Sequence, residues 1–233
     1  MWQELRSEIR PKGIEVVTVA LDVGGSEKAG PFIERANAEH PSLIDVEHRL
    51  DALFGIVNVP SGMWIDEHGS IVRPPEPAWP GKSMFREIMK GQKIDFESLD
   101  PYLRDTLFET TKIRVDPRKY AEALRDWAEH GAASRYVLSP DEVLARSRAR
   151  PPEASRAAAH FAMGQHLWRA GRTDEAVPHF REARRLQPEN WTYKRQAWSF
   201  VDPLQRPSET FEGDWLGDVQ AIGAENYYEP LDM

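Results

Sequence analysis

The chain has 233 residues, 40% of them hydrophobic, and a formal net charge of −8. This composition predicts a globular protein with room for one large or two small domains. The negative charge argues against binding nucleic acid or an anionic membrane, and the absence of cysteine excludes disulfides, thiolate metal sites and dithiol chemistry in this chain. No apolar run approaches the about 20 residues of a spanning helix and no charged-then-apolar leader is seen, so we expect no membrane insertion and a cytoplasmic location.

The first part of the chain alternates helix and strand patterns. Trp2, Leu5 and Ile9 recur at helical spacing, and a Pro-Lys-Gly triplet stops that helix. Residues 14–21 are apolar and β-branched, which predicts a buried parallel strand. A second helix is expected over 28–39, with Ser26 as its N-cap.

The inward face of that second helix is expected to carry Phe32, Ile33 and Ala36. Leu43 and Ile44 predict a short strand. A third helix is expected over 46–55, with Gly55 as its C-cap and an inward face formed by Leu50, Leu53 and Phe54.

Two further strands are predicted at 63–66 and 70–73, joined by a tight turn at 67–69. The following stretch, residues 73–80, contains four prolines, so we expect it to leave the sheet in extended form. A short helix is expected over 82–90, and residues 95–116 give mixed signals that assign no form.

The run from Leu53 to Val72 resembles the thioredoxin-like superfamily, in particular its disulfide-reductase and peroxiredoxin-type branches. There a Val-Pro or Thr-Pro pair opens a strand ending in Asp, and a glycine turn leads into an antiparallel strand. The resemblance implies that Pro60 is the cis-proline of a substrate-docking loop and that Val59 precedes it. The helix-plus-strand insertion over 24–45 is typical of the same branches.

The same resemblance implies that the first core strand and the Cys-x-x-Cys turn lie before Met1. Either the start is set too late, in which case any export signal would lie upstream as well, or the catalytic half has been lost. We favour the first alternative, because without the middle strand two apolar strands lose their hydrogen-bonding partners.

Two more helices follow with clear start signals. Asp116 and a proline open a helix over 118–130, with Tyr120, Leu124 and Trp127 on one face. We expect it to be the last thioredoxin-type helix. Ser139, followed by a proline and two acidic residues, opens another helix.

Residues 157–190 fit the roughly 34-residue frame of a tetratricopeptide repeat, a pair of antiparallel helices. The residues that carry this resemblance are Gly164, Ala176, Phe180, Ala183 and Pro188. His160 stands where the repeat usually has Trp, and Leu167 where it has Tyr. A lone repeat cannot bury its apolar face, so we expect it to lean on a capping helix begun by Trp191 and on the first module.

The predicted fold class is therefore α/β, a partial thioredoxin-like sheet with flanking helices plus a C-terminal helical, tetratricopeptide-like module. The expected domains are 1–135, an N-terminally incomplete thioredoxin-like domain, and 136–204, the helical module. Residues 205–233 hold seven acidic residues and one arginine, which predicts an acidic tail.

The sequence contains no catalytic constellation, no cofactor motif and no metal-binding pattern; His160 and His166, for example, are six apart and do not share a helix face. Two hypotheses remain. The chain is most of a thiol-disulfide oxidoreductase or peroxide-handling protein, inactive as it stands because it has no cysteine. Alternatively, it is a non-catalytic interaction module that binds a protein or peptide at the Pro60 loop or on the helical module.

Overall fold

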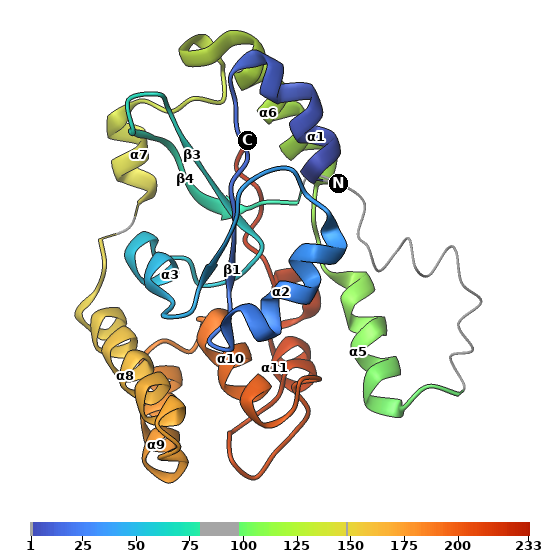
Figure 1. The fold of residues 1–233 in the computed structure, drawn as a ribbon, viewed down its shortest axis with the longest axis vertical. Helices are drawn as coiled ribbons and strands as arrows, with labels where there is room; N and C mark the ends of the chain where they lie inside the picture. Colours follow the sequence, from blue (N-terminus) through green and yellow to red (C-terminus); the bar gives the residue numbers. More distant parts are fainter. Residues whose placement is uncertain (1, 80–97, 148) are drawn as a thin grey trace.

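The computed structural model describes residues 2–79, 98–147 and 149–233. In that part of the chain, four short strands form two separate two-stranded sheets, and helices surround them (Figure 1). A mixed fold with a helical C-terminal region is therefore present. Among the described strands, β1 pairs with β2 and β3 pairs with β4, and the two pairs are not hydrogen-bonded to each other.

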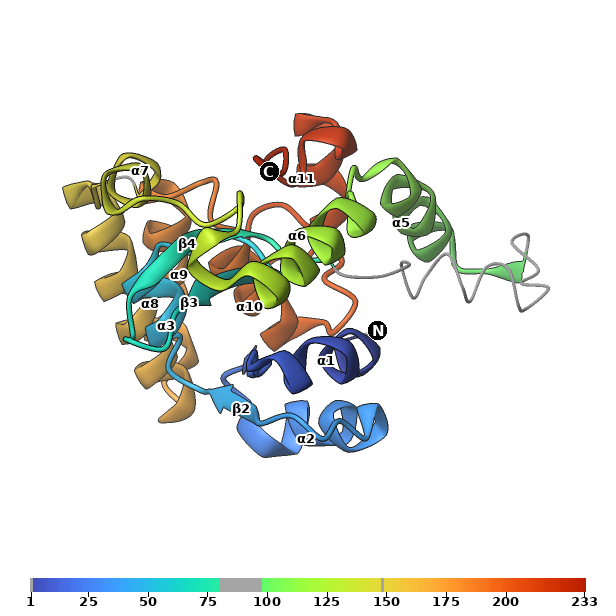
Figure 2. The same ribbon diagram turned by 90° about the horizontal axis from the view of Figure 1, so that it is seen from above.

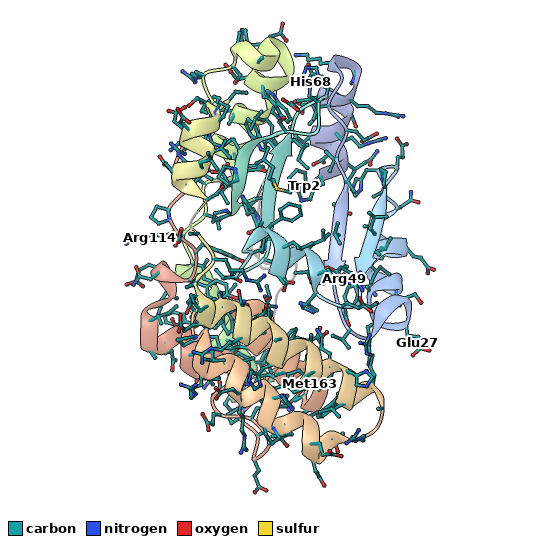
Figure 3. The ribbon with its side chains drawn as sticks, turned by 90° about the vertical axis from the view of Figure 1, so that its left-hand side faces the viewer. Trp2, Glu27, Arg49, His68, Arg114 and Met163 are labelled. Atoms are coloured by element: carbon teal, nitrogen blue, oxygen red, sulfur yellow. The ribbon has the colours of Figure 1, made fainter. Side chains whose placement is uncertain are left out.

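The first sheet follows the N-terminal helix. Its elements and those leading into it are α1 Trp2–Ile9, the 3-10 turn Arg10–Lys12, β1 Thr18–Leu21, α2 Gly25–Ala36 and β2 Ser42–Asp45. β1 and β2 run parallel, with Thr18 opposite Ser42 and Leu21 opposite Asp45. In Figure 3 this pair stands beside the second pair of strands, above the hairpin of α8 and α9.

Three details of this region differ from the sequence-based expectation. The strand predicted at 14–21 begins at Thr18 and is half-buried, because among the described strands it is paired along one edge. Ser26 is not the N-cap, since α2 begins at Gly25 without a side-chain cap. Phe32 is 69% exposed and Ala29 is buried instead, because a sheet of two strands offers little surface for a helix to cover.

The second sheet follows α3 Arg49–Phe54 and consists of β3 Ser61–Ile65 and β4 Ile71–Pro77, which pair antiparallel as expected. Gly55 ends α3 in a left-handed conformation, also as expected. Leu53, expected inward, is exposed, and Asp51 is buried in its place. Pro74, Pro75 and Pro77 do not leave the sheet: they lie in β4, where an edge strand tolerates residues without an N–H group, and Pro80 lies outside the described residues. The Val59–Pro60 peptide bond is cis.

Of the next three helices, the first packs on the C-terminal region, the second on α1 and the third on β4. They are α5 Pro101–Lys112, α6 Pro117–His130 and α7 Pro140–Arg146. Asp116 caps α6 and Ser139 caps α7, both as predicted, whereas α5 was not predicted. Helices α1 and α6 lie side by side (Figure 2) and enclose a core with β3 in which Trp64 stacks on Trp127. The helix expected over 82–90 lies outside the described residues.

The C-terminal region is helical. Its elements are α8 Pro152–Arg169, α9 Thr173–Leu186, α10 Trp191–Val201, α11 Trp215–Ile222 and a final 3-10 turn Ala224–Asn226. The predicted hairpin and its capping helix are present. The segment 205–233, however, is not a free acidic tail, because Phe211, Trp215 and Val219 are buried in the same core as the hairpin.

Candidate functional site

Helices α8 and α9 form the hairpin through a close approach at Gly164. A Cβ atom placed on Gly164 would lie 2.9 Å from Cε1 of Phe180, so the ring of Phe180 occupies the space a side chain would need. Ala176 and Ala183 are completely buried, and Pro188 follows the end of α9 by two residues. The structure thus brings Gly164, Ala176, Phe180 and Ala183 together at one helix–helix contact.

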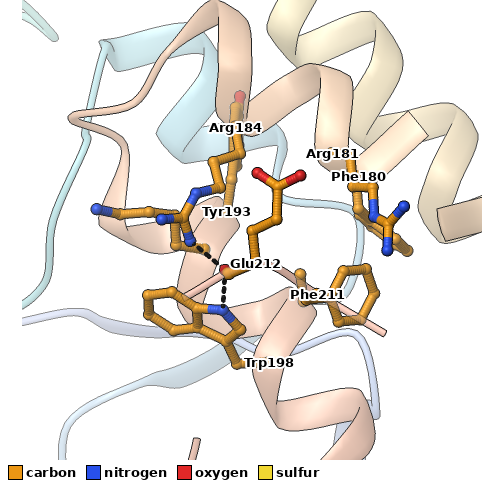
Figure 4. A pocket seen from close by; sticks show the side chains of 9 residues that line it. Phe180, Arg181, Arg184, Tyr193, Trp198, Phe211 and Glu212 are labelled. Carbon is orange, nitrogen blue, oxygen red and sulfur yellow. Dashed lines mark hydrogen bonds between the residues drawn. The ribbon is translucent and has the colours of Figure 1, made fainter. Parts of the chain in front are cut away.

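One face of this hairpin is covered by the chain itself (Figure 4). Arg184 Nη1 and Trp198 Nε1 both donate to the backbone oxygen of Glu212, at 2.6 and 3.1 Å. The remaining space among these residues is about 10 Å³, too small for any ligand beyond a single water molecule.

A charged cluster fastens α11 to the same face. The carboxylate of Asp218 accepts two hydrogen bonds of 3.0 Å from Arg184 and one of 3.0 Å from Lys194. The Lys194 ammonium also lies 3.5 Å from the centre of the Trp191 ring. Burial lowers the pKa of Lys194 below its ordinary value, while the Asp218 carboxylate acts in the opposite direction. The cluster is thus a structural contact and offers no free group to a partner.

The opposite face of α8 is open. Between α3 and α8 lies a cleft of about 340 Å³. Its α8 wall consists of small side chains, namely Ser155, Ala158, Ala159 and Ala162. Its base contains Phe161 and Tyr193, whose rings stack at 4.1 Å, and the exposed Arg49 and Arg150 lie at its rim.

Behind this cleft, a buried polar network joins α3 to α10. His48 Nδ1 lies 2.9 Å from Asp51 Oδ2, and Thr192 Oγ1 donates to the same oxygen at 2.9 Å. Gln196 Oε1 lies 3.2 Å from His48 Nε2 and accepts from the backbone N–H of Val23 at 3.2 Å. Because Asp51 and His48 are almost fully enclosed, this network fixes the strand-bearing half to the helical half and holds the α3 wall of the cleft in place.

The Pro60 loop, expected to dock a substrate, is in contact with the C-terminal segment. Tyr228 Oη donates to the backbone oxygen of Val59 at 2.8 Å, and Asn58 Nδ2 donates to the backbone oxygen of Tyr227 at 2.9 Å. Pro60 itself is half-buried, and its carbonyl accepts from Ala78. A partner at this loop would therefore have to displace Tyr228 from Val59.

Sequence reasoning missed one contact between two polar side chains. His160 on α8 lies against His179 on α9, with their Nδ1 atoms 3.0 Å apart. These residues are 19 positions apart, so no single-helix spacing could reveal them; the antiparallel geometry of the predicted repeat was the available signal. No cluster of three or more metal-ligating side chains occurs within the described ranges 2–79, 98–147 and 149–233.

Residues 157–190 match the family model of the tetratricopeptide repeat, in the frame expected from the sequence. The chain has no match among curated proteins or among solved structures. The helical region is therefore tetratricopeptide-like, and a repeat of this kind indicates a protein-interaction module. Among the described helices, none is long and apolar enough to cross a membrane.

Proposed function

We propose that this protein is a non-catalytic interaction module that binds a segment of a partner polypeptide in the cleft between α3 and α8. The observation that carries the proposal is the contrast between the two faces of the repeat. The α9–α10 face is filled by residues 211–228 of the same chain, whereas the α8 face is left as an open cleft of about 340 Å³.

The lining of the cleft indicates the chemistry of the bound segment. A wall of alanine and serine side chains lets another backbone approach α8 closely, and the aromatic base offers apolar contact. Arg150 at the rim is exposed and makes one long hydrogen bond of 3.4 Å, to Ala154. The fitting partner is a short apolar segment that carries a carboxylate, which the Arg150 guanidinium can bind in a bidentate manner.

A random peptide library displayed on phage tests this proposal with the purified 233-residue chain. We expect selected peptides to contain apolar residues beside an acidic residue. Ala159→Trp, which fills the cleft from α8, should weaken their binding at least tenfold, and Arg150→Gln should weaken the acidic ones by about tenfold. Ala170→Trp is the matched control, because Ala170 is exposed at the end of α8 and does not line the cleft.

The proposal fails if selection yields no binder, or if Ala159→Trp and Ala170→Trp bind every selected peptide as well as the unmodified chain does. Far-UV circular dichroism of both variants controls for folding. If a selected peptide loses binding only when a contact of the Pro60 loop is changed, for example in Tyr228→Phe, its binding site is that loop and not the cleft.

We also propose that residues 1–135 are a thioredoxin-like scaffold that acts without a thiol. What supports this is the parallel pairing of β1 with β2, the antiparallel pairing of β3 with β4, and the packing of α6 on β3. Because the chain has no cysteine, it should not accelerate the reduction of insulin disulfides by dithiothreitol above the rate of a buffer blank. Acceleration above that rate would contradict a thiol-free role.

A further inference from the structure

Two histidines meet across the repeat hairpin. His160 lies in the third turn of α8 and His179 in the second turn of α9, and their Nδ1 atoms are 3.0 Å apart. The ring centres are 5.1 Å apart and the ring planes are inclined by 38°, so the rings meet through their Nδ1 edges rather than stacking face to face. Both side chains are half-buried, which leaves the pair open to solutes.

The contact restricts where the protons can be. A neutral imidazole carries one N–H, so a bond between two Nδ1 atoms requires one ring to donate and the other to accept. When both protons move to the Nε2 atoms instead, two imidazole lone pairs from different helices face the same small region. Neutral imidazole nitrogens are the commonest protein ligands of transition-metal ions.

We propose that His160 and His179 bind one divalent transition-metal ion through their Nδ1 atoms, with Cu²⁺ and Ni²⁺ preferred over Zn²⁺. Metal–nitrogen bonds of roughly 2.0–2.1 Å that span a 3.0 Å separation give an N–metal–N angle of about 95°. This is close to the right angle of tetragonal Cu²⁺ and Ni²⁺ sites and well below the tetrahedral angle that Zn²⁺ favours. Water molecules complete the coordination.

The surroundings of the pair include an acidic group on the same side. Glu182 lies one turn after His179 and forms a two-pronged ion pair with the exposed Arg185. The Arg185 guanidinium is the main cause that lowers the pKa of Glu182. Because residues three apart lie on the same side of a helix, Glu182 follows His179 on one face of α9. An exposed ion pair of this kind is weak, so Glu182 is available to offset the charge of a bound cation.

Isothermal titration of CuSO₄ into the tag-free 233-residue chain tests the proposal. We expect one Cu²⁺ per chain, with an electron paramagnetic resonance spectrum showing superhyperfine splitting from two nitrogens. His160→Ala and His179→Gln should each weaken binding at least tenfold, since even the loss of an outer-shell partner typically costs 10–100-fold. His166→Ala is the matched control. His166 is exposed on α8 and lies six residues after His160, so the two histidines do not share a helix face.

A second readout does not depend on the variants folding. Binding that joins α8 to α9 should raise the melting temperature of the unmodified chain by roughly 5 °C or more at a hundredfold excess over Kd. The proposal is overturned if Cu²⁺ binds the unmodified chain no more tightly than it binds His160→Ala and His179→Gln. It is also overturned if His166→Ala loses as much affinity for Cu²⁺ as those two variants do. A spectrum with one coordinated nitrogen would overturn it as well.

Discussion

At the scale of single residues, Gln165 is a buried polar side chain with one unpaired hydrogen-bond donor. It is 1% exposed on the inner side of α8, and its Nε2 has no hydrogen-bond partner in the described structure. Gln165→Met, which has nearly the same shape, removes that unpaired donor. We expect the free energy of unfolding to rise by about 1–2 kcal/mol.

Urea denaturation followed by circular dichroism measures this change. Gln165→Glu is the control in the opposite direction, because it buries a carboxylate without a partner and should destabilise the chain. Loss of stability in Gln165→Met would show that the amide has a partner that the structure does not account for.

The stability of the fold in acid depends in part on a single carboxylate, that of Glu15. Arg6, which is almost fully buried, donates to both carboxylate oxygens of Glu15, at 2.6 and 2.9 Å. This hydrogen bonding lowers the pKa of Glu15 from its ordinary value of 4.5 to about 2. Because the folded state holds the carboxylate ionised, the resulting stability is fully present above pH 4.5 and is lost as the pH falls toward 2.

We therefore expect Glu15→Gln to be less stable than the unmodified chain at pH 7 and to lose less stability between pH 4.5 and pH 2. Urea midpoints measured at half-unit pH steps across this window give the comparison. The neighbouring carboxylate Glu39, exposed and bound to Arg6 through one oxygen, supplies the control variant Glu39→Gln, with a smaller effect. Parallel pH curves for all three proteins would show that the Arg6–Glu15 contact does not contribute.

At the scale of elements, the approach of α8 to α9 depends on Gly164. Gly164→Ala puts a methyl group 2.9–3.0 Å from three atoms of the Phe180 ring, so the ring or the helix has to move. Overpacking of this kind costs about 1–3 kcal/mol, against a gain of about 1 kcal/mol from replacing glycine in a helix. We expect a net loss of up to about 2 kcal/mol in the free energy of unfolding, measured by urea denaturation.

Gly30→Ala is the matched control for this substitution. Gly30 lies inside α2, and beyond its chain neighbours and the helix backbone a Cβ there meets no atom within 4 Å. We expect a gain of about 0.5–1 kcal/mol, reduced by the crowding that Pro31 imposes on the residue before it. The double variant Gly164→Ala, Phe180→Leu should recover part of the loss. If Gly164→Ala were as stabilising as Gly30→Ala, the close contact between α8 and α9 would not exist in solution.

The sequence predicted an element correctly where the signal for that element lies within a few neighbouring residues. Helices α6 and α7 were predicted because Asp116 and Ser139 are caps followed by proline, and such signals act within one turn. The inward faces of α2 and α3 were predicted only in part, since burial there depends on which other elements cover them. Thus Leu53 faces solvent while Asp51 is held inside by Thr192, a residue 141 positions away.

The C-terminal segment, residues 205–233, is a second case in which burial was not predicted. Its acidic residues predicted a free tail, but Phe211, Trp215 and Val219 recur every four residues and form a buried stripe, with the acidic side chains between them. That periodicity was present in the sequence and is the signal that could have predicted α11. The His160–His179 contact and the cleft beside α3 join different elements, so they could be located only once the hairpin had a structure.

At the scale of the whole molecule, the two halves are joined through a small number of buried polar atoms. Asp51 accepts from Thr192 and pairs with His48, whose other ring nitrogen faces Gln196. The backbone oxygen of Val57 adds a second connection, since it accepts from the N–H groups of Trp191 and Thr192. Because a single tetratricopeptide repeat cannot bury its own apolar face, the helical half depends on these contacts as well as on residues 211–228.

We therefore expect Asp51→Ala to give the two halves different free energies of opening. It removes the partner of His48 Nδ1 and one of the two partners of Thr192 Oγ1, which also donates to Asn190 at 2.6 Å, and costs about 1–3 kcal/mol. In native-state hydrogen exchange, the slowest amides of β1–β4 and of α8–α10 should share one free energy of opening in the unmodified chain and two different ones in the variant. Asp174→Ala, at an exposed acid in the first turn of α9, should leave the shared value almost unchanged. If both halves of Asp51→Ala still opened together, the apolar contacts alone would suffice to couple them, and the α3 wall of the cleft would not need the polar network behind it.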